Sequence, residues 1–360
     1  MNNHKFPENL PWLKNNTVLY TLSGSRAYGI NTEDSDYDYK GIAVAPEKYY
    51  KGFLSKFEQS EFRPFDNGES VVYEIQKFFK LAADANPNIL DSLFCTEDEI
   101  IYSSNEGRIL IDNRNEFVSQ KAYKSYYGYA ISQFKKMESH RRWLVNKPKN
   151  KPERIDFGLP DNNDYIKAMN NLMNSVQEKV NSWQIDYGEL AQSEKISIYN
   201  QITKFLAELQ LTRDDYFYQA LKTFNSTDEL YEKIVREKKF RDANNAWCDY
   251  IKWETERNPK RKALEEKMHY DGKDACHTIR LLQMCEEILS GKGVIVKRPN
   301  REELLAIRNG ALTFEQIVEY VEKQNTKFQL LSKNCSLPLR PNYEKLDNMC
   351  ISIINKILNK

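Results

Sequence analysis

Several features that would place a protein in a class at once are missing from this sequence. No apolar run approaches the roughly 20 residues that a membrane-spanning helix needs. The start of the chain has neither the apolar stretch nor the small-residue cleavage site of a secretory signal. The net charge is only +1, so the overall positive field that attracts nucleic acids is also missing. We therefore expect a soluble cytoplasmic protein that binds no membrane and contacts any nucleic acid through a local basic patch.

Cysteine pairs of the CxxC or CxxH type are missing as well, although the chain has 6 cysteines. Zinc ligation is therefore not expected, and scattered thiols without a secretory signal are typical of a reducing compartment. Internal repeats and low-complexity tracts are also absent from the sequence. What remains is a chain of 360 residues with ordinary globular composition, which is long enough for two or three domains.

Strand and helix patterns alternate in the first part of the chain. Residues 17–22, 36–45 and 70–73 are rich in β-prone side chains and predict three strands. Helical patterns follow the third strand at residues 75–85 and 89–94. The beginning of the chain is therefore predicted to be a small sheet with helices.

The pattern becomes mostly helical from about residue 115 onward. Residues 146–164 interrupt it with three prolines and a glycine, which predicts a loop. The sequence thus predicts an α+β fold. A small α/β core with a mixed sheet would occupy residues 1–115, and a mainly helical region would occupy residues 116–360.

A glycine and a serine follow the first predicted strand directly. Gly24 allows a tight turn and a close approach of the backbone to a phosphate, and the residues after it predict a short helix. The amide groups at the start of a helix point toward a bound anion, which the helix dipole also favours. Ser25 adds a hydroxyl group that can donate a hydrogen bond. Gly24 and Ser25 are therefore candidate phosphate-binding residues.

Two aspartates open the second predicted strand. Asp36 and Asp38 project from the same face of a regular strand, because its side chains alternate. Two adjacent carboxylates repel each other unless a cation lies between them, and such hard oxygen ligands suit Mg²⁺ or Mn²⁺. A phosphate-binding turn followed by a carboxylate pair is what phosphoryl or nucleotidyl transfer requires.

Other interpretations of this segment fit the residues less well. A calcium loop that starts at Asp34 would need Gly and Glu where the sequence has Tyr39 and Ala45. The GxGxxG and GK[ST] motifs of dinucleotide and P-loop sites are absent from the sequence. The plain structural alternative is a Gly-Ser turn followed by acidic residues in a surface loop.

The string GSRAYGINTEDSDYDYKGI resembles the signature of the DNA polymerase β-like nucleotidyltransferase superfamily. More narrowly, it resembles the RlaP-type family, predicted nucleotidyltransferases associated with RNA repair. Segments within residues 77–94, 273–281 and 303–310 are also similar to that family's pattern. The resemblance covers residues 17–110 and 265–320.

The resemblance implies a role for each residue of the motif. Gly24 and Ser25 would bind the nucleoside triphosphate, and Asp36 and Asp38 would bind two Mg²⁺ or Mn²⁺ ions. A third carboxylate on a following strand would complete one metal site and help to activate the attacking hydroxyl group.

Two glutamates are candidates for this third carboxylate. Glu69 and Glu74 are five residues apart, so a regular strand places them on opposite faces and only one can reach the metals. We favour Glu69, because the family's acidic residue lies about that far ahead of the lysine that Lys77 matches.

Basic residues provide further candidates for binding the nucleotide. Lys273, His277 and Arg280 have the spacing of one helix face, and the resemblance implies that this stripe faces the triphosphate. A solvated helix face is the structural alternative. Arg26 directly follows Ser25 and would either reach the phosphates or form a salt bridge.

The resemblance therefore implies a metal-dependent nucleotidyltransferase that moves a nucleoside monophosphate from a triphosphate such as ATP to a hydroxyl acceptor. An RNA or tRNA end is the expected acceptor, and the basic residues 135–154 are the candidate RNA contact. The alternatives are transfer to a protein or small molecule, and a non-catalytic nucleotide-binding module. Residues from about 150 to 260 have no counterpart in the family and could be an insertion.

Overall fold

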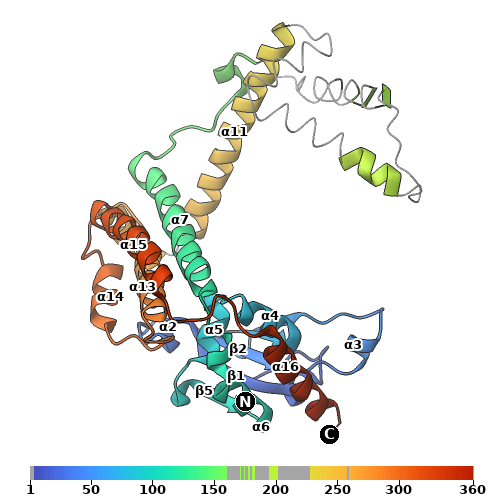
Figure 1. Ribbon diagram of the computed structural model, residues 1–360. Helices are drawn as coiled ribbons and strands as arrows, with labels where there is room; N and C mark the ends of the chain where they lie inside the picture. Colours follow the sequence, from blue (N-terminus) through green and yellow to red (C-terminus); the bar gives the residue numbers. More distant parts are fainter. Residues whose placement is uncertain are drawn as a thin grey trace. The chain divides into compact units, whose positions relative to one another are not determined.

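Contacts within the computed structural model divide the chain into two compact units (Figure 1). Unit 1 joins Met1–Val145 to Pro259–Lys360, and unit 2 is Asn146–Asn258. The predicted division between residues 115 and 116 cuts the chain elsewhere and stays a prediction. The structure describes residues 4–159, 171, 174, 177–178, 181–182, 194–201, 228–257 and 259–359.

A mixed sheet of five strands lies in unit 1, in the order β3-β4-β2-β1-β5. β2 and β4 are parallel, whereas the other neighbouring pairs are antiparallel. The predicted mixed sheet and the α+β class are therefore confirmed. The strands are β1 (Thr17–Ser23), β2 (Tyr37–Ala43), β3 (Gln59–Phe62), β4 (Gly68–Glu74) and β5 (Ile100–Ser103).

The two faces of the sheet are covered differently. On one face, Ile42 of β2 packs into a core that contains Phe78 of α4. On the other face, Tyr20 and Tyr39 stack on each other, and Phe65 meets Tyr39 edge-on. The helices and turns of this region are α1 (Leu13–Asn16), α2 (Gly24–Ala27), α3 (Lys48–Lys51), α4 (Ile75–Ala83), α5 (Pro87–Leu93), η1 (Glu97–Glu99), α6 (Asn105–Asp112) and η2 (Arg114–Phe117).

Helices fill the rest of unit 1, and α13 packs against α7, α14 and α15. Leu281 of α13 belongs to the same hydrophobic core as Ile42 of the sheet. The sheet and these helices therefore form one body. The helices are η3 (Tyr123–Tyr127), α7 (Gly128–Val145), α12 (Pro259–Met268), α13 (Gly272–Leu289), α14 (Arg301–Arg308), α15 (Phe314–Asn334) and α16 (Tyr343–Leu358).

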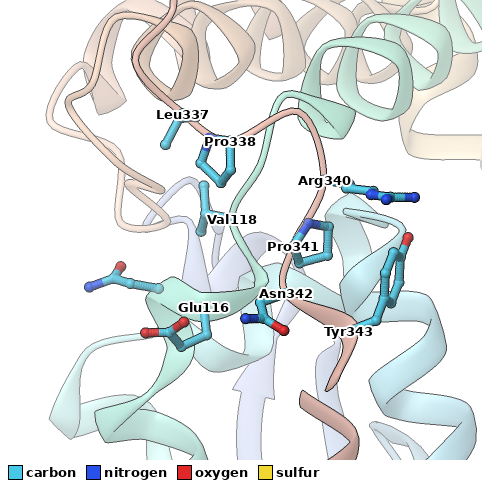
Figure 2. Close-up of a pocket in the computed structure, with 9 residues that line it drawn as sticks. Glu116, Val118, Leu337, Pro338, Arg340, Pro341, Asn342 and Tyr343 are labelled. Carbon is cyan, nitrogen blue, oxygen red and sulfur yellow. The ribbon is translucent and has the colours of Figure 1, made fainter. Parts of the chain in front are cut away.

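The C-terminal segment returns to the sheet region, where α16 packs beside α4 (Figure 1). The Gln120 side chain donates a hydrogen bond of 2.8 Å to the carbonyl of Leu337. The backbone amide of Gln120 donates one of 2.9 Å to the carbonyl of Pro338. A pocket of about 610 Å³ lies between residues 115–118 and 337–343 (Figure 2). None of the residues that line it belongs to the sequence-predicted site.

Unit 2 contains η4 (Arg154–Phe157) and the long helix α11 (Asp228–Glu256) in its described part. Arg154 Nη1 donates a hydrogen bond of 2.8 Å to Glu237 of α11, whose side chain is almost fully buried. Arg154, the last residue of the predicted basic segment, therefore serves the packing of unit 2.

Some elements differ from the sequence-based expectation. β3 and β5 were not predicted, because each has only four residues and β3 contains polar residues at three of them. The predicted loop agrees with the structure for residues 146–153, which have no helix or strand. Residues 154–157 form the short helix η4 instead, and the part from residue 160 onward lies outside the described residues. Among the described helices, none is long and apolar enough to cross a membrane.

Candidate active site

Two acidic residues lie side by side where the parallel strands β2 and β4 begin. Asp38 lies directly opposite Glu69 in the register of the two strands. Residues that are opposite each other in a sheet project from the same face. The Glu69 side chain is exposed, whereas Asp38 is partly covered. The two residues are therefore neighbours at the end of the sheet where both strands begin.

The turn at Gly24 lies directly against Asp38. A side-chain carbon at Gly24 would be only 2.0 Å from Asp38 Oδ2, and Gly24 has a φ of +65°. Both observations favour glycine, because other residues rarely adopt this backbone conformation and would displace the carboxylate. α2 starts at this residue and contains Ser25. The turn and the carboxylate thus form one continuous surface.

The charges around Asp38 favour a cation. Burial is the largest cause that raises the pKa of Asp38, and the nearby charges of Glu69 and Asp36 raise it further. Lys40 and Lys273 act in the opposite direction. A carboxylate that is destabilised by burial and by two acidic neighbours would be relieved by a divalent ion. This donor set, beside the Gly24 turn, fits Mg²⁺ or Mn²⁺.

Residues 5–150 match the sequence model of RlaP, the RNA repair pathway DNA polymerase beta family. This part of the chain belongs to the RlaP family. The predicted family is therefore confirmed for these residues, which contain the whole Gly24 and Asp38 surface. It is a family of polymerase β-like nucleotidyltransferases associated with RNA repair.

A similar curated protein is an uncharacterized 38.9 kDa protein in the nrdC-mobD intergenic region of Enterobacteria phage T4. It is 34% identical over 129 residues, which cover 33% of this chain and 38% of the relative. The chain thus spans about two fifths of the length of this relative.

Arg26 is held by the turn that precedes β2 in the RlaP region. Its guanidinium group donates hydrogen bonds to the carbonyls of Ser35, at 2.6 Å, and Asp36, at 3.2 Å. It also stacks on Tyr37, with 3.6 Å between the guanidinium carbon and the ring centroid. These contacts fix the backbone at Asp36, immediately before the strand. The role of Arg26 in binding phosphate stays a prediction.

The two candidate glutamates of the RlaP region lie on opposite faces of β4, as expected from their spacing. Glu74 is 6% exposed and accepts hydrogen bonds from the Tyr50 hydroxyl, at 2.7 Å, and from the amide of Lys77, at 3.0 Å. It therefore caps α4, with Tyr50 as its second partner. Glu69, on the face of Asp38, has the better position for a third metal ligand.

The three predicted basic residues of α13 differ in their surroundings. Lys273 is exposed and lies close enough to affect the pKa of Asp38. His277 meets the ring of Tyr129 edge-on, with 5.3 Å between centroids. Burial is the largest cause that lowers the pKa of His277 to about 3, and Arg280, Lys273 and Lys136 lower it further. Its imidazole is therefore neutral at pH 7.

Arg280 is not at the surface, because only 2% of it is exposed. Its Nη1 atom lies 3.8 Å from Oδ2 of Asp91, and its guanidinium group stacks on the ring of Tyr28, at 3.6 Å. The helix face that begins at Lys273 thus runs from the solvent into the core. A direct contact of Arg280 with the triphosphate stays a prediction.

Sequence reasoning missed two residues near the RlaP motif. Lys40 lies two residues after Asp38, on the same face of β2, and donates a hydrogen bond to the carbonyl of Asn88. Burial lowers its pKa to about 8, against the opposing effects of Asp91 and Asp38. Asp91 is 4% exposed. The strand pattern could have indicated Lys40, but no local signal indicated Asp91.

One more cluster of possible metal ligands lies in the described part of unit 1. The ligand atoms of His140, Asp271 and Asp274 are all within 4.8 Å of one another, which is not so for Asp36, Asp38 and Glu69. Asp274 lies 3.2 Å from Lys136, and Asp271 accepts hydrogen bonds from two amides at the start of α13. Both carboxylates thus have protein partners.

Proposed function

We propose that this protein transfers a nucleoside monophosphate from a triphosphate to a hydroxyl group at the end of an RNA, such as a tRNA. The observation that supports this most is the close fit of the Gly24 turn against the Asp38 carboxylate, beside Glu69 on the parallel strand. Such a surface offers backbone amides for phosphates and carboxylates for cations side by side.

The carboxylates of Asp36, Asp38 and Glu69 would hold two Mg²⁺ or Mn²⁺ ions. When bound, these ions would lower the pKa of the acceptor hydroxyl and neutralise negative charge on the triphosphate. The amides that follow Gly24 and the hydroxyl of Ser25 would bind the terminal phosphates. Lys273 would add a positive charge from α13, since it already acts on Asp38.

The reaction would then be an in-line displacement. The acceptor oxygen forms a bond to the α-phosphorus, while the bond to the bridging oxygen breaks and pyrophosphate leaves. The proton of the acceptor hydroxyl passes to solvent or to a carboxylate of the site. The protein needs no covalent intermediate, because its groups only have to orient the reactants and balance their charge.

An RNA acceptor is supported by the association of the RlaP family with RNA repair. Residues 135–154 provide lysines at the surface, among them Lys147, Lys149 and Lys151. Such a cluster can bind phosphates even though the net charge of the chain is only +1.

The test is to incubate the purified protein with Mg²⁺ and each α-phosphate-labelled nucleoside triphosphate, in the presence of total cellular RNA or of a protein extract. We expect label in RNA, and the preferred nucleotide would identify the base. Label in protein alone would contradict the RNA acceptor and favour protein modification.

The matched variants are Asp36→Asn with Asp38→Asn, and Asp112→Asn as a control. Asp112 is exposed at the end of α6 and belongs to no predicted site. The double variant should lose transfer by at least about 10²-fold, whereas the control should keep it. Full transfer by the double variant would refute the catalytic site.

A further inference from the structure

We propose that Asp91 and Arg280 position the active site from the core, by linking α13 to the phosphate turn and to the strand that carries Asp38. They would be positioning residues, because both side chains are buried. The inference rests on the proposed function, and it gives Arg280, which was predicted to contact the nucleotide, a positioning role together with Asp91.

Asp91 lies at the centre of a network of buried contacts with Tyr28, Tyr126 and Arg280. It is 4% exposed, on the short helix α5. Its Oδ2 atom accepts a hydrogen bond of 2.5 Å from the Tyr28 hydroxyl, and its Oδ1 atom accepts one of 3.3 Å from Tyr126. Arg280 supplies the opposite charge at 3.8 Å. A buried carboxylate is tolerated only with such partners, so their loss would disturb the whole cluster.

Tyr28 connects the ion pair to the phosphate turn. It directly follows α2, the helix that Gly24 and Ser25 begin, and its amide donates a hydrogen bond of 3.2 Å to the carbonyl of Gly24. The Tyr28 ring is held from two sides, by its hydroxyl bond to Asp91 and by the Arg280 guanidinium on its face. A shift of either charged side chain would therefore be transmitted to the turn.

Lys40 connects the ion pair to the catalytic strand. It lies on the same face of β2 as Asp38, and its ammonium group donates a hydrogen bond to the carbonyl of Asn88 on α5, the helix that carries Asp91. Negative and positive charges thus alternate from Asp38 through Lys40 and Asp91 to Arg280. This order is electrostatically favourable only while all four groups keep their places.

The network also sets the position of Lys273. Lys273 and Arg280 are on the same helix, about 10 Å apart along its axis at 1.5 Å per residue. Fixing Arg280 in the core therefore fixes the position of Lys273, at the exposed start of α13, relative to the sheet. The residues matched by the RlaP family end at 150, so they contain Asp91 but obtain its cationic partner from α13, outside the match.

The experiment compares Asp91→Asn, Arg280→Met and the double variant in the full chain, by melting temperature and by steady-state transfer. Each single change leaves one buried charge without its partner, so both single variants should melt at lower temperature. The double variant removes both charges and should regain most of the melting temperature. We expect its kcat to stay at least about tenfold below the wild-type value, since small misplacements at an active site are costly.

A second buried pair, which also involves α13, gives the control. The Arg298 amide donates a hydrogen bond of 3.0 Å to the carbonyl of Tyr28, and this backbone bond is kept when only the side chain is changed. Arg298 donates two hydrogen bonds, of 2.6 and 2.8 Å, to Glu287 of this helix, and its side chain is 2% exposed. The Arg298→Met, Glu287→Gln double variant should change the melting temperature but not kcat. If the Asp91→Asn, Arg280→Met variant also had wild-type kcat once folded, the pair would be structural only and the proposal would be wrong.

Two further outcomes separate this proposal from the proposed function. If the wild type binds Mg²⁺ and nucleotide without transferring the nucleotide, the variants are compared by the dissociation constant of the nucleotide instead of kcat. We then expect the Asp91→Asn, Arg280→Met variant to bind the nucleotide at least about tenfold more weakly. If the wild type neither transfers nor binds nucleotide, the proposed function fails and the positioning role fails with it.

Discussion

At Gly24, both the conformation of the backbone and the space beside Asp38 favour a residue without a side chain. Its φ of +65° and the 2.0 Å that would separate a side-chain carbon at this position from Asp38 Oδ2 are independent reasons for glycine. The first is a matter of backbone strain, and the second is a matter of space beside a carboxylate. They can be distinguished by comparison with another glycine.

Gly24→Ala should reduce transfer by about 10²-fold, because Asp38 must move away from the new methyl group. Gly29→Ala is the matched control, since Gly29 has a φ of +71° but its nearest neighbour is Lys297 Cγ at 3.7 Å. Both variants should lose similar stability from backbone strain, measured by thermal unfolding. Equal activity of the two variants would show that space beside Asp38 does not matter.

Glu69 and Glu74 should give opposite results when each is changed to glutamine. Glu69→Gln should lower transfer by about 10²-fold or more with little change in melting temperature. Glu74→Gln should mainly lower stability, by about 1 kcal/mol, because it weakens the cap of α4 and the Tyr50 contact. The measurements are initial rates and thermal unfolding of the folded variants. A loss of activity only in Glu74→Gln would assign the third carboxylate to Glu74.

At the scale of elements, the candidate site depends on the parallel pairing of β2 with β4 and on the packing of α13 into the core. The pairing places Asp38 opposite Glu69, and α13 brings Lys273 toward Asp38 while it buries Arg280. His277 lies between these two basic residues on the helix. Its burial, and then the positive charges around it, lower its pKa, so we expect α13 to be sensitive to acid.

His277 should make the folded state less stable below about pH 6.5. Its pKa is 6.5 when unperturbed and is lowered to about 3 in the folded protein, first by burial. Between these values the unfolded chain binds a proton that the folded protein does not, so stability falls as the pH falls, by at most about 1.4 kcal/mol per unit. His277→Gln should therefore lose less stability between pH 7 and pH 5 in chemical denaturation. Parallel losses in variant and wild type would exclude this effect.

At the scale of the whole molecule, the nucleotide and the RNA would use different parts of the chain. The candidate catalytic surface belongs to unit 1, whereas Lys149 and Lys151 belong to unit 2. Since the net charge is only +1, binding of RNA has to depend on such local groups.

The Lys149→Ala, Lys151→Ala variant should bind single-stranded RNA more weakly and with a smaller dependence on salt. Each lost phosphate contact should reduce the slope of log affinity against log salt by about 0.7. The control is Lys333→Ala with Lys356→Ala, which removes the same charge from exposed positions on α15 and α16. Titrations at several salt concentrations measure both slopes. Identical slopes for the two variants would contradict the assignment of RNA binding to residues 135–154.

Local patterns in the sequence determined a large part of this description. The β-prone run before Gly24 and the Asp36-x-Asp38 spacing indicated the phosphate turn, the carboxylate pair and the family, because strand periodicity and glycine's backbone freedom are local properties. The same periodicity placed Glu69 and Glu74 on opposite faces of β4, which their burial confirms. The short strands β3 and β5 had no comparable local signal.

Only the tertiary structure decided which of these residues meet. The parallel pairing of β2 with β4 brings Glu69 to Asp38, and the shared core brings Arg280 of α13 to Asp91. Helical spacing put Lys273, His277 and Arg280 on one face, but it could not show that this face descends from solvent into the core. The depth of a side chain is set by how helices pack on the sheet, and that packing depends on residues far apart in the sequence.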